Sequence, residues 1–329
     1  ARLGRARRPF ESVVLKQVLS EEEIARLAVH RHRLAGVEIT TQFLRHYPFG
    51  PEFAHALGAM GRIDEDDLKR LDPVRYSATR FVGKRGAERF YESSLHGEVG
   101  HQKVEVDAHG RIRQVLDINP PIAGQNITLQ LDSRLQRVAA EALGQRRGAV
   151  VALDPRSGGI LAMVSQPSYD PNLFITGISA ADYRQLTADR NRPMFNRVIN
   201  GQYAPGSTFK PFVGLTGIAN GATRWDERIE DRGWFRLKGQ QRIYRDWSWT
   251  RGNSGGQGLV DLNRAIYRSS NVYFYDLASR MDIDRMSGFL ARFGFGQRTA
   301  LDIPEASSGV LPNRAWKRGA RGEPWYPGD

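Results

Sequence analysis

The sequence predicts an α+β protein with antiparallel strands, and three observations lead to this prediction. Two compact apolar runs, Gly148–Leu153 and Ile160–Val164, flank a turn rich in proline and glycine, which is typical of a β-hairpin. Apolar residues recur at helical spacing over 135–143, just before the hairpin. Another helix is expected downstream, after Pro205-Gly206. A helix, a hairpin and a helix in this order favour an antiparallel sheet with helices packed on it.

The first part of the chain predicts short mixed elements. Ser20 and Glu23 have the spacing of a capping box, so a helix is expected to begin there. The acidic run 64–67 indicates a second helix start, because negative side chains are favoured at a helix N-terminus. Lys103–Val106 and Arg111–Leu116 are predicted strands on either side of a short polar turn.

Residues 119–124 are the best linker candidate, since they contain two prolines and a glycine. We therefore expect one domain at 1–120 and a second at 121–329. After the linker, Ile127–Leu131 alternates like a strand, and Gly144 is expected to end the helix that follows.

The composition limits the classes of partner. A net charge of +12 fits an anionic partner, but the arginines are dispersed, with one dense run at residues 2–8. No zinc-finger, RNA-recognition or helix-turn-helix signature accompanies them, so we expect no nucleic-acid binding. Cysteine is absent, which excludes disulfides and thiolate metal sites. No stretch is apolar enough for a membrane span, and the chain begins with Ala1 rather than methionine.

Ser207 and Lys210 place a hydroxyl and an amine one helical turn apart, directly after the Pro-Gly breaker. Residues three apart share a helix face, so the amine can reach the hydroxyl and take its proton. A serine with its own base is a nucleophile for acyl transfer. The amine must be neutral for this, and burial at the positive end of a helix lowers a lysine pKa. Taken alone, the pair also fits an exposed helix start.

Ser269 and Asn271 form a second motif, S-x-N, which occurs once in the chain, as S-x-x-K does. Ser269 can relay a proton between Lys210 and a leaving amine. Asn271 offers an amide that can bond both Lys210 and a substrate carbonyl. Taken alone, this motif also fits a polar turn before an amphipathic helix. The two motifs together make catalysis the stronger hypothesis.

With these motifs the chain resembles the class B penicillin-binding proteins. Residues 203–211 are similar to the active-site sequence of that family almost throughout, and 294–296 and 299–305 resemble its transpeptidase domain. Residues 83–92 and 95–97 resemble its non-catalytic pedestal. Three further stretches are most similar to the elongation-specific members of the class: 54–58, 166–172 and 244–247.

The resemblance implies a transpeptidase domain related to serine β-lactamases, an antiparallel sheet with helices on both sides and a helical lobe, preceded by an extended mixed α/β pedestal. It implies that Ser207 forms an acyl-enzyme with peptidoglycan stem peptides, with Lys210, Ser269 and Asn271 completing the site. β-Lactams would acylate the same serine. A glycan polymerase and a scaffold protein are the implied partners, and no cofactor is implied. The domains would lie in the periplasm, held by a single-pass anchor in the bacterial inner membrane.

One motif of the family, K-S/T-G, is missing. Lys317 and Gly319 form a K-x-G tripeptide, but it lacks the hydroxyl and does not lie in a strand pattern. In the family this motif lies on the strand beside the nucleophile and binds the substrate carboxylate. We therefore expect the chain to lack both an N-terminal anchor and the final catalytic segment, and to be weakly active or inactive as it stands.

Rival functions are a division-specific transpeptidase, a β-lactamase-like hydrolase, and a non-catalytic β-lactam sensor or scaffold. Against the hydrolase, Glu305 is followed at the fourth position by Gly309, where an E-x-x-x-N loop requires asparagine. Glu305 is therefore expected to be a structural carboxylate. Asp226, Asp231 and Asp246 hint at a cation but have no His or Cys partner in this region, so no metal is expected.

Overall fold

The computed structural model describes residues 13–41, 43–108, 112–250 and 255–329. These residues form two compact units. The first unit contains Ala1–Gly201 and Asp302–Glu305, and the second contains Gln202–Leu301 and Ala306–Asp329.

Two helices of the first unit begin at the positions that the sequence predicts. α1 (Glu21–Val29) starts at the capping box, in which Ser20 Oγ accepts the Glu23 N–H at 3.2 Å and Glu23 Oε2 accepts the Ser20 N–H at 3.0 Å. α3 (Glu65–Arg70) starts in the same way at Asp64, so both predicted helix starts are confirmed. The other helical segments of this unit are η2 (Arg31–Arg33), η3 (Gly50–Glu52), α2 (Ala54–Leu57), α4 (Gly86–Phe90), α5 (Glu92–Leu95), α6 (Ser133–Leu143), η4 (Pro171–Phe174), α7 (Ala180–Ala188) and α8 (Arg197–Asn200).

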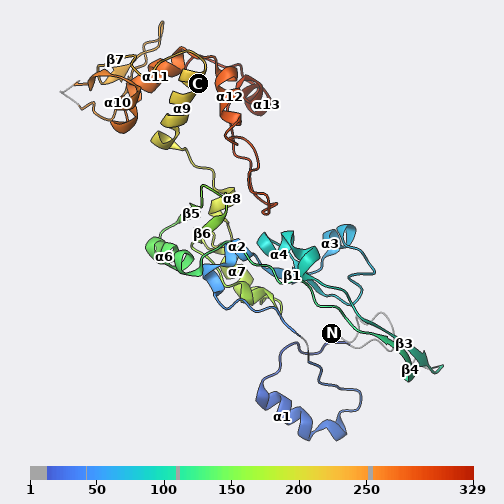
Figure 1. Cartoon of the computed structure of the whole chain (residues 1–329). Coiled ribbons are helices and arrows are strands. Elements are labelled where there is room, and N and C mark those ends of the chain that lie inside the picture. The colour runs from blue at the N-terminus through green and yellow to red at the C-terminus, as the bar shows by residue number, and fades with distance from the viewer. Residues whose placement is uncertain (1–12, 42, 109–111, 251–254) are drawn as a thin grey trace. The chain divides into compact units, whose positions relative to one another are not determined.

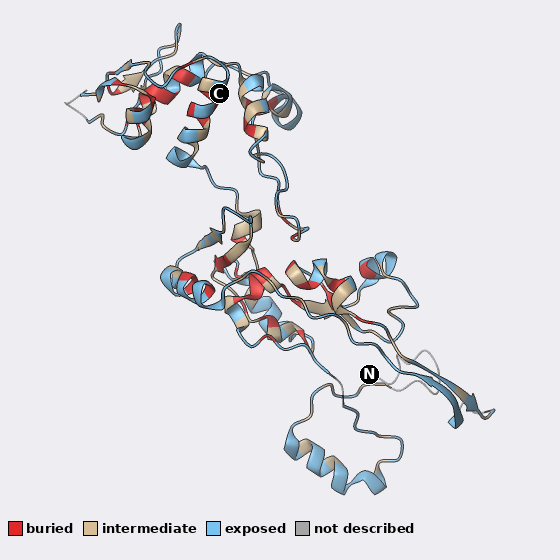
Figure 2. Cartoon of the chain, in the orientation of Figure 1, coloured by how far each residue is buried: buried red, intermediate tan, exposed pale blue. Residues whose placement is uncertain are grey.

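The first unit also contains a long two-stranded ribbon (Figure 1). It consists of β3 (His101–Val106) and β4 (Ile112–Asn119), which pair antiparallel as predicted. Its turn residues 109–111 lie outside the described residues, as does the arginine run at 2–8. Every residue of β4 is exposed, so the ribbon is mostly pale blue in Figure 2 and has no core of its own. A shorter pair, β1 (Met60–Arg62) with β2 (Phe81–Gly83), lies nearer the helices.

The segment 119–124, predicted as a linker, is partly paired with the chain before the ribbon. The Glu98 and Ile122 backbones exchange hydrogen bonds of 2.9 and 3.0 Å, and the Gln125 N–H donates to the Ser94 carbonyl at 2.8 Å. This segment is therefore held against the first unit, rather than crossing open space.

β5 (Gly148–Leu153) and β6 (Ile160–Gln166) form the predicted central hairpin, and α6 packs against Val164 of β6. Gly144 ends α6 with a φ of 54°, as predicted. The strand predicted at Ile127–Leu131 is wrong, because the structure has no strand there. The fully buried amide of Gln136 instead accepts the Met163 N–H at 2.7 Å and donates to the Met163 carbonyl at 2.8 Å. The backbone groups that a further strand would need are thus already bonded.

In the second unit, three helices around one apolar core position the candidate site. These helices are α9 (Lys210–Ala219), α10 (Leu262–Tyr267) and α11 (Asn271–Ser279), and Figure 2 shows buried residues gathered along them. Leu262, Tyr273 and Leu277 are fully buried there. The other elements are η5 (Gly206–Phe209), α12 (Ile283–Ala291), α13 (Arg314–Arg321), and the antiparallel pairs β7 (Ile229–Asp231) with β10 (Gly258–Val260) and β8 (Trp234–Phe235) with β9 (Tyr244–Arg245). Nowhere in the described part of the chain is a helix long and apolar enough to cross a membrane.

Candidate active site

The S-x-x-K motif lies where a 3₁₀ turn passes into an α-helix. Ser207 is in η5, and Lys210 is the first residue of α9. Gly206 has a φ of 58°, a conformation that glycine adopts without cost, and Pro211 fits the first turn of α9. The sequence expectation of a helix start after Pro205-Gly206 is confirmed, but Ser207 precedes the α-helix, rather than lying on its face.

The S-x-N motif fills the tight turn between α10 and α11. Ser270 caps α11, since its Oγ accepts the Tyr273 N–H at 3.1 Å. Ser269 has a φ of 55°, which is uncommon for a residue with a Cβ and costs about 1–3 kcal/mol. Two backbone bonds hold this turn: the Ser269 N–H donates to the Ile266 carbonyl at 3.1 Å and the Ser270 N–H to the Ala265 carbonyl at 3.0 Å.

The structure brings all four predicted residues together. Lys210 Nζ donates to Ser269 Oγ at 3.0 Å, to the Ser269 carbonyl at 2.7 Å and to Asn271 Oδ1 at 2.6 Å. Ser269 Oγ lies 2.8 Å from Ser207 Oγ. The described hydrogen bonds therefore link Lys210 to Ser207 through the Ser269 hydroxyl.

This arrangement limits where a neutral Lys210 can accept a proton. The Ser269 carbonyl and the Asn271 amide oxygen only accept hydrogen bonds, so each needs an N–H of Lys210. The lone pair of the neutral amine is then left to face the Ser269 hydroxyl, which can donate. In the structure Ser269 Oγ–H donates to Ser207 Oγ. When Ser269 donates to a neutral Lys210 instead, its oxygen can accept from Ser207 Oγ–H. The geometry thus supports transfer of the Ser207 proton to Lys210 by way of Ser269.

Burial lowers the pKa of Lys210 below its ordinary value, while the negative charges of Asp246 and Asp231 oppose that shift. Nζ also lies 5.6 Å from the ring centroid of Phe274. A lower pKa leaves a larger fraction of the amine neutral near physiological pH. That is the state a general base requires.

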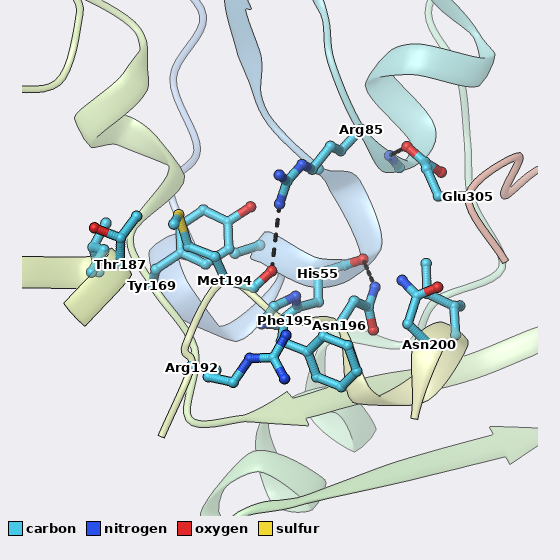
Figure 3. Close-up of a pocket in the computed structure, with 15 residues that line it drawn as sticks. His55, Arg85, Tyr169, Thr187, Arg192, Met194, Phe195, Asn196, Asn200 and Glu305 are labelled. Atoms are coloured by element: carbon cyan, nitrogen blue, oxygen red, sulfur yellow. Dashed lines mark hydrogen bonds between the residues drawn. The ribbon is translucent and has the colours of Figure 1, made fainter. Parts of the chain in front are cut away.

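Glu305 lies elsewhere, in the first unit. Figure 3 shows it beside the start of α4, where its Oε1 accepts the Gly86 N–H at 3.0 Å. It lines a cavity of about 470 Å³ together with His55 and Arg85, and none of the four predicted catalytic residues lines that cavity. The backbone contact supports the expectation that Glu305 is a structural carboxylate.

Lys317 lies in α13, where its buried ammonium pairs with Asp329. The rejected K-x-G tripeptide is therefore helical. Asp226 pairs with Arg224 at 3.4 Å on the surface, with both side chains about four-fifths exposed. Among the described residues, no three His, Cys, Asp or Glu side chains are grouped for a metal ion.

Sequence reasoning did not assign roles to Asp231 and Asp246, both of which contact the S-x-N turn. The sequence analysis considered both aspartates only as part of a cation site, which it rejected, and nothing in the local sequence indicated a contact with the S-x-N turn. A second unassigned contact is the Trp247 indole, whose Nε1–H donates to the Arg268 carbonyl at 3.1 Å. Nearby, the Arg245 guanidinium lies 3.9 Å from the centroid of the Trp249 ring, in a cation–π contact.

Comparison with known proteins defines the class. The profile of the penicillin-binding protein transpeptidase domain matches residues 148–322, and that of the penicillin-binding protein dimerisation domain matches 1–129. The chain therefore belongs to the class B penicillin-binding proteins, as the motifs predicted.

Within the class, the chain is similar to the elongation transpeptidases. It is 43% identical to the peptidoglycan D,D-transpeptidase MrdA of Acinetobacter baumannii, over 98% of this chain and 47% of the relative. The structure of PBP2 of Pseudomonas aeruginosa in complex with WCK 5153 matches with 48% identity and a TM-score of 0.79, over 88% of this chain and 59% of that one. A complex of PBP2 and MreC from Helicobacter pylori matches with 30% identity and a TM-score of 0.84, over 95% and 57%. The chain spans about half the length of the curated relatives it matches.

Proposed function

We propose that the protein is a peptidoglycan D,D-transpeptidase of cell-wall elongation with Ser207 as its nucleophile. The observation that carries the proposal is the hydrogen-bonded series Ser207 Oγ, Ser269 Oγ and Lys210 Nζ, at 2.8 and 3.0 Å. A serine hydroxyl connected to a half-buried amine of lowered pKa is an activated nucleophile.

In the first step, Ser207 Oγ forms an ester bond with the carbonyl carbon of the penultimate D-alanine of a stem peptide. The peptide bond to the terminal D-alanine breaks, and the proton from Ser207 passes through Ser269 to Lys210 and then to the leaving amine. In the second step, the amine of a neighbouring stem peptide attacks the ester, forms the cross-link and releases Ser207. Asn271 is suited to hold the substrate carbonyl with its amide. A β-lactam would acylate Ser207 by the first step.

The same proposal includes the domain boundaries, the partners and the location of the protein. We place a pedestal domain at 1–120 and a transpeptidase domain at 121–329, supported by the separate family matches at 1–129 and 148–322. The pedestal is the proposed docking site for a scaffold protein and a glycan polymerase, and the match to a complex of PBP2 with MreC supports the scaffold partner. The exposed β3–β4 ribbon is a candidate surface for such docking. The proposed location is the periplasm, on an anchor in the inner membrane.

The test is labelling with a fluorescent penicillin, in the 329-residue chain and in a full-length form, alongside Ser207→Ala. The matched control is Ser308→Ala, an exposed serine of the second unit whose Oγ donates to the Gly309 carbonyl at 3.3 Å. We expect the full-length form and Ser308→Ala to be labelled and Ser207→Ala to lose the label completely. Labelling that survives Ser207→Ala would show that the nucleophile is another residue.

A cross-linking assay with stem peptides separates the proposed enzyme from the sensor or scaffold alternative. A transpeptidase forms cross-linked product, and Ser207→Ala abolishes it. A sensor would be labelled by penicillin at Ser207 yet form no product under conditions in which a known transpeptidase does.

A further inference from the structure

Two buried carboxylates lie behind the S-x-N turn. The side chains belong to Asp231 and Asp246, whose exposed fractions are 1% and 4%. Neither forms an ion pair within the described part of the chain, and the groups that donate to them there are neutral. Burying a carboxylate without a counter-ion costs free energy, which the hydrogen bonds that it accepts offset only in part. Asp246 accepts a hydrogen bond from Asn271 and Asp231 accepts one from Ser270, both in the S-x-N motif beside Lys210.

Asp246 holds the third residue of the motif. Its Oδ1 accepts the Asn271 N–H at 2.7 Å, and its Oδ2 accepts Ser248 Oγ–H at 2.8 Å and Gln257 Nε2–H at 3.1 Å. The Asp246 N–H donates to the Gly233 carbonyl at 2.8 Å, which fixes its position just after β9. Because Asn271 bonds Lys210 through its own side chain, the Asp246 contact fixes one of the three acceptors around the amine.

Asp231 holds the middle residue. Its Oδ2 accepts Ser270 Oγ–H at 2.6 Å, and its Oδ1 accepts the Gly233 N–H at 2.8 Å. With its proton directed at Asp231, the Ser270 oxygen is free to accept the Tyr273 N–H that starts α11. Asp231 thereby orients the cap of α11 and the turn in which Ser269 adopts its left-handed conformation.

We propose that Asp246 and Asp231 are positioning residues for the acylation reaction: they hold Asn271 and Ser269 in place around Lys210 and supply the negative charge that faces its ammonium. This inference rests on the proposed function, since it assumes that Lys210 deprotonates Ser207. Asp246 acts directly through Asn271, and Asp231 acts through Ser270.

The negative charge of Asp231 and Asp246 affects the pKa of Lys210, which an uncharged structural contact would not do. Within the part of the chain that the structure describes, the charged groups that act on Lys210 are these two aspartates, from β7 and from the segment after β9, while α11 presents the uncharged Phe274 ring. Removal of one negative charge leaves the ammonium less stabilised, so the pKa of Lys210 falls further. The neutral amine then persists to lower pH, and the acid limb of the acylation rate should move to lower pH.

The test compares Asp246→Asn, Asp246→Ala and Asp231→Asn with wild type in the full-length protein, by acylation rate against pH with a fluorescent penicillin. Asp246→Asn keeps an oxygen to accept the Asn271 N–H. The Gln257 amide, whose Oε1 is buried without a partner in the structure, can turn to accept from the new amide. The matched control is Asp226→Asn, an exposed carboxylate of the same unit that bonds none of the motif residues.

We expect Asp246→Asn to acylate with an acid limb displaced to lower pH, and Asp246→Ala to acylate about 100-fold more slowly, since misplaced catalytic groups lose about that factor. Asp231→Asn should displace the limb in the same direction, and Asp226→Asn should match wild type. If Asp246→Ala does not fold, the acid limb of Asp246→Asn decides by itself. Wild-type rates and an unmoved limb in the Asp246 variants would overturn the inference. Failure of wild-type protein to label at Ser207 would instead overturn the proposed function.

Discussion

At the scale of single residues, the proposed proton transfer depends on the position of the Ser269 hydroxyl. Ser269 is placed between the Ser207 hydroxyl and the Lys210 amine by a left-handed backbone that serine rarely adopts. Lys210 has all three of its N–H directions occupied by two residues of one turn. Small displacements of that turn would therefore change the protonation and the reach of the base together.

The first prediction concerns the base itself. The acylation rate should rise with pH as Lys210 loses its proton, and should level off below the value near 10.4 that an ordinary lysine would give. Lys210→Arg keeps the charge but cannot deprotonate, so acylation should fall by about 10²–10⁴-fold at every pH tested. Rapid-mixing measurements of acylation between pH 6 and about 10 check both statements. Lys69→Arg, an exposed cation of the first unit, is the control and should leave the profile unchanged.

At the scale of elements, α9 begins with Lys210, the proposed base, and its close packing depends on glycine. Gly217 faces the fully buried Leu277 of α11, and Gly214 faces Leu262 of α10. Glycine lowers the intrinsic stability of a helix, so its presence at both contacts indicates that the approach of the helices needs the space. This close approach sets the position of Lys210 relative to the S-x-N turn at the start of α11.

The second prediction follows from that packing. A Cβ at Gly217 would lie 2.9 Å from both Leu277 Cδ atoms and 3.0 Å from Thr223 Cγ2. Gly217→Ala should therefore lower the free energy of unfolding by about 1 kcal/mol, because overpacking outweighs the gain in helix propensity. Gly319→Ala in α13, where nothing lies within 4 Å of the added carbon, should raise it by about 0.5–1 kcal/mol. Urea unfolding of both variants measures the difference, and equal effects of the two substitutions would contradict the packing argument.

At the scale of the whole molecule, the positive charge is divided among many local partners. Arginines pair with acids in both units, as in Arg26–Glu22, Arg224–Asp226, Arg280–Glu227 and Arg314–Asp282. These pairs neutralise part of the positive charge of the described residues locally, and the remaining net charge of +12 gives the chain a long-range attraction for anions.

The third prediction is that the protein does not bind duplex DNA specifically. Any complex at low salt should disappear at about 150 mM salt, because non-specific phosphate contacts weaken steeply as salt rises. A gel mobility-shift titration at several salt concentrations measures this. A discrete complex that survives at that salt would show that the charge forms a nucleic-acid surface after all.

The sequence could predict the elements whose signals are local. The predicted elements are the capping box at Ser20, the helix start at the acidic run 64–67, the hairpin with its Pro/Gly turn and the glycine end of α6. All depend on residues a few positions apart, and each is confirmed. The prediction of a strand at Ile127–Leu131 was wrong. Its alternating pattern is local, whereas strand pairing depends on hydrogen-bonding groups elsewhere in the fold. The amide of Gln136 had already taken the hydrogen bonds of Met163 that a neighbouring strand would use.

For the proposed site, the sequence by itself determined which residues are the candidates, because S-x-x-K and S-x-N are motifs that can be read along the chain. The candidates are Ser207, Lys210, Ser269 and Asn271. Only the tertiary structure decided how they connect: Lys210 meets Ser207 through Ser269, across about 60 residues of chain. It also decided that Asp231 and Asp246 bond that turn. The role proposed for these carboxylates depends on their burial and on the groups that donate hydrogen bonds to them. Both are set by the folded core, and no local sequence pattern shows them.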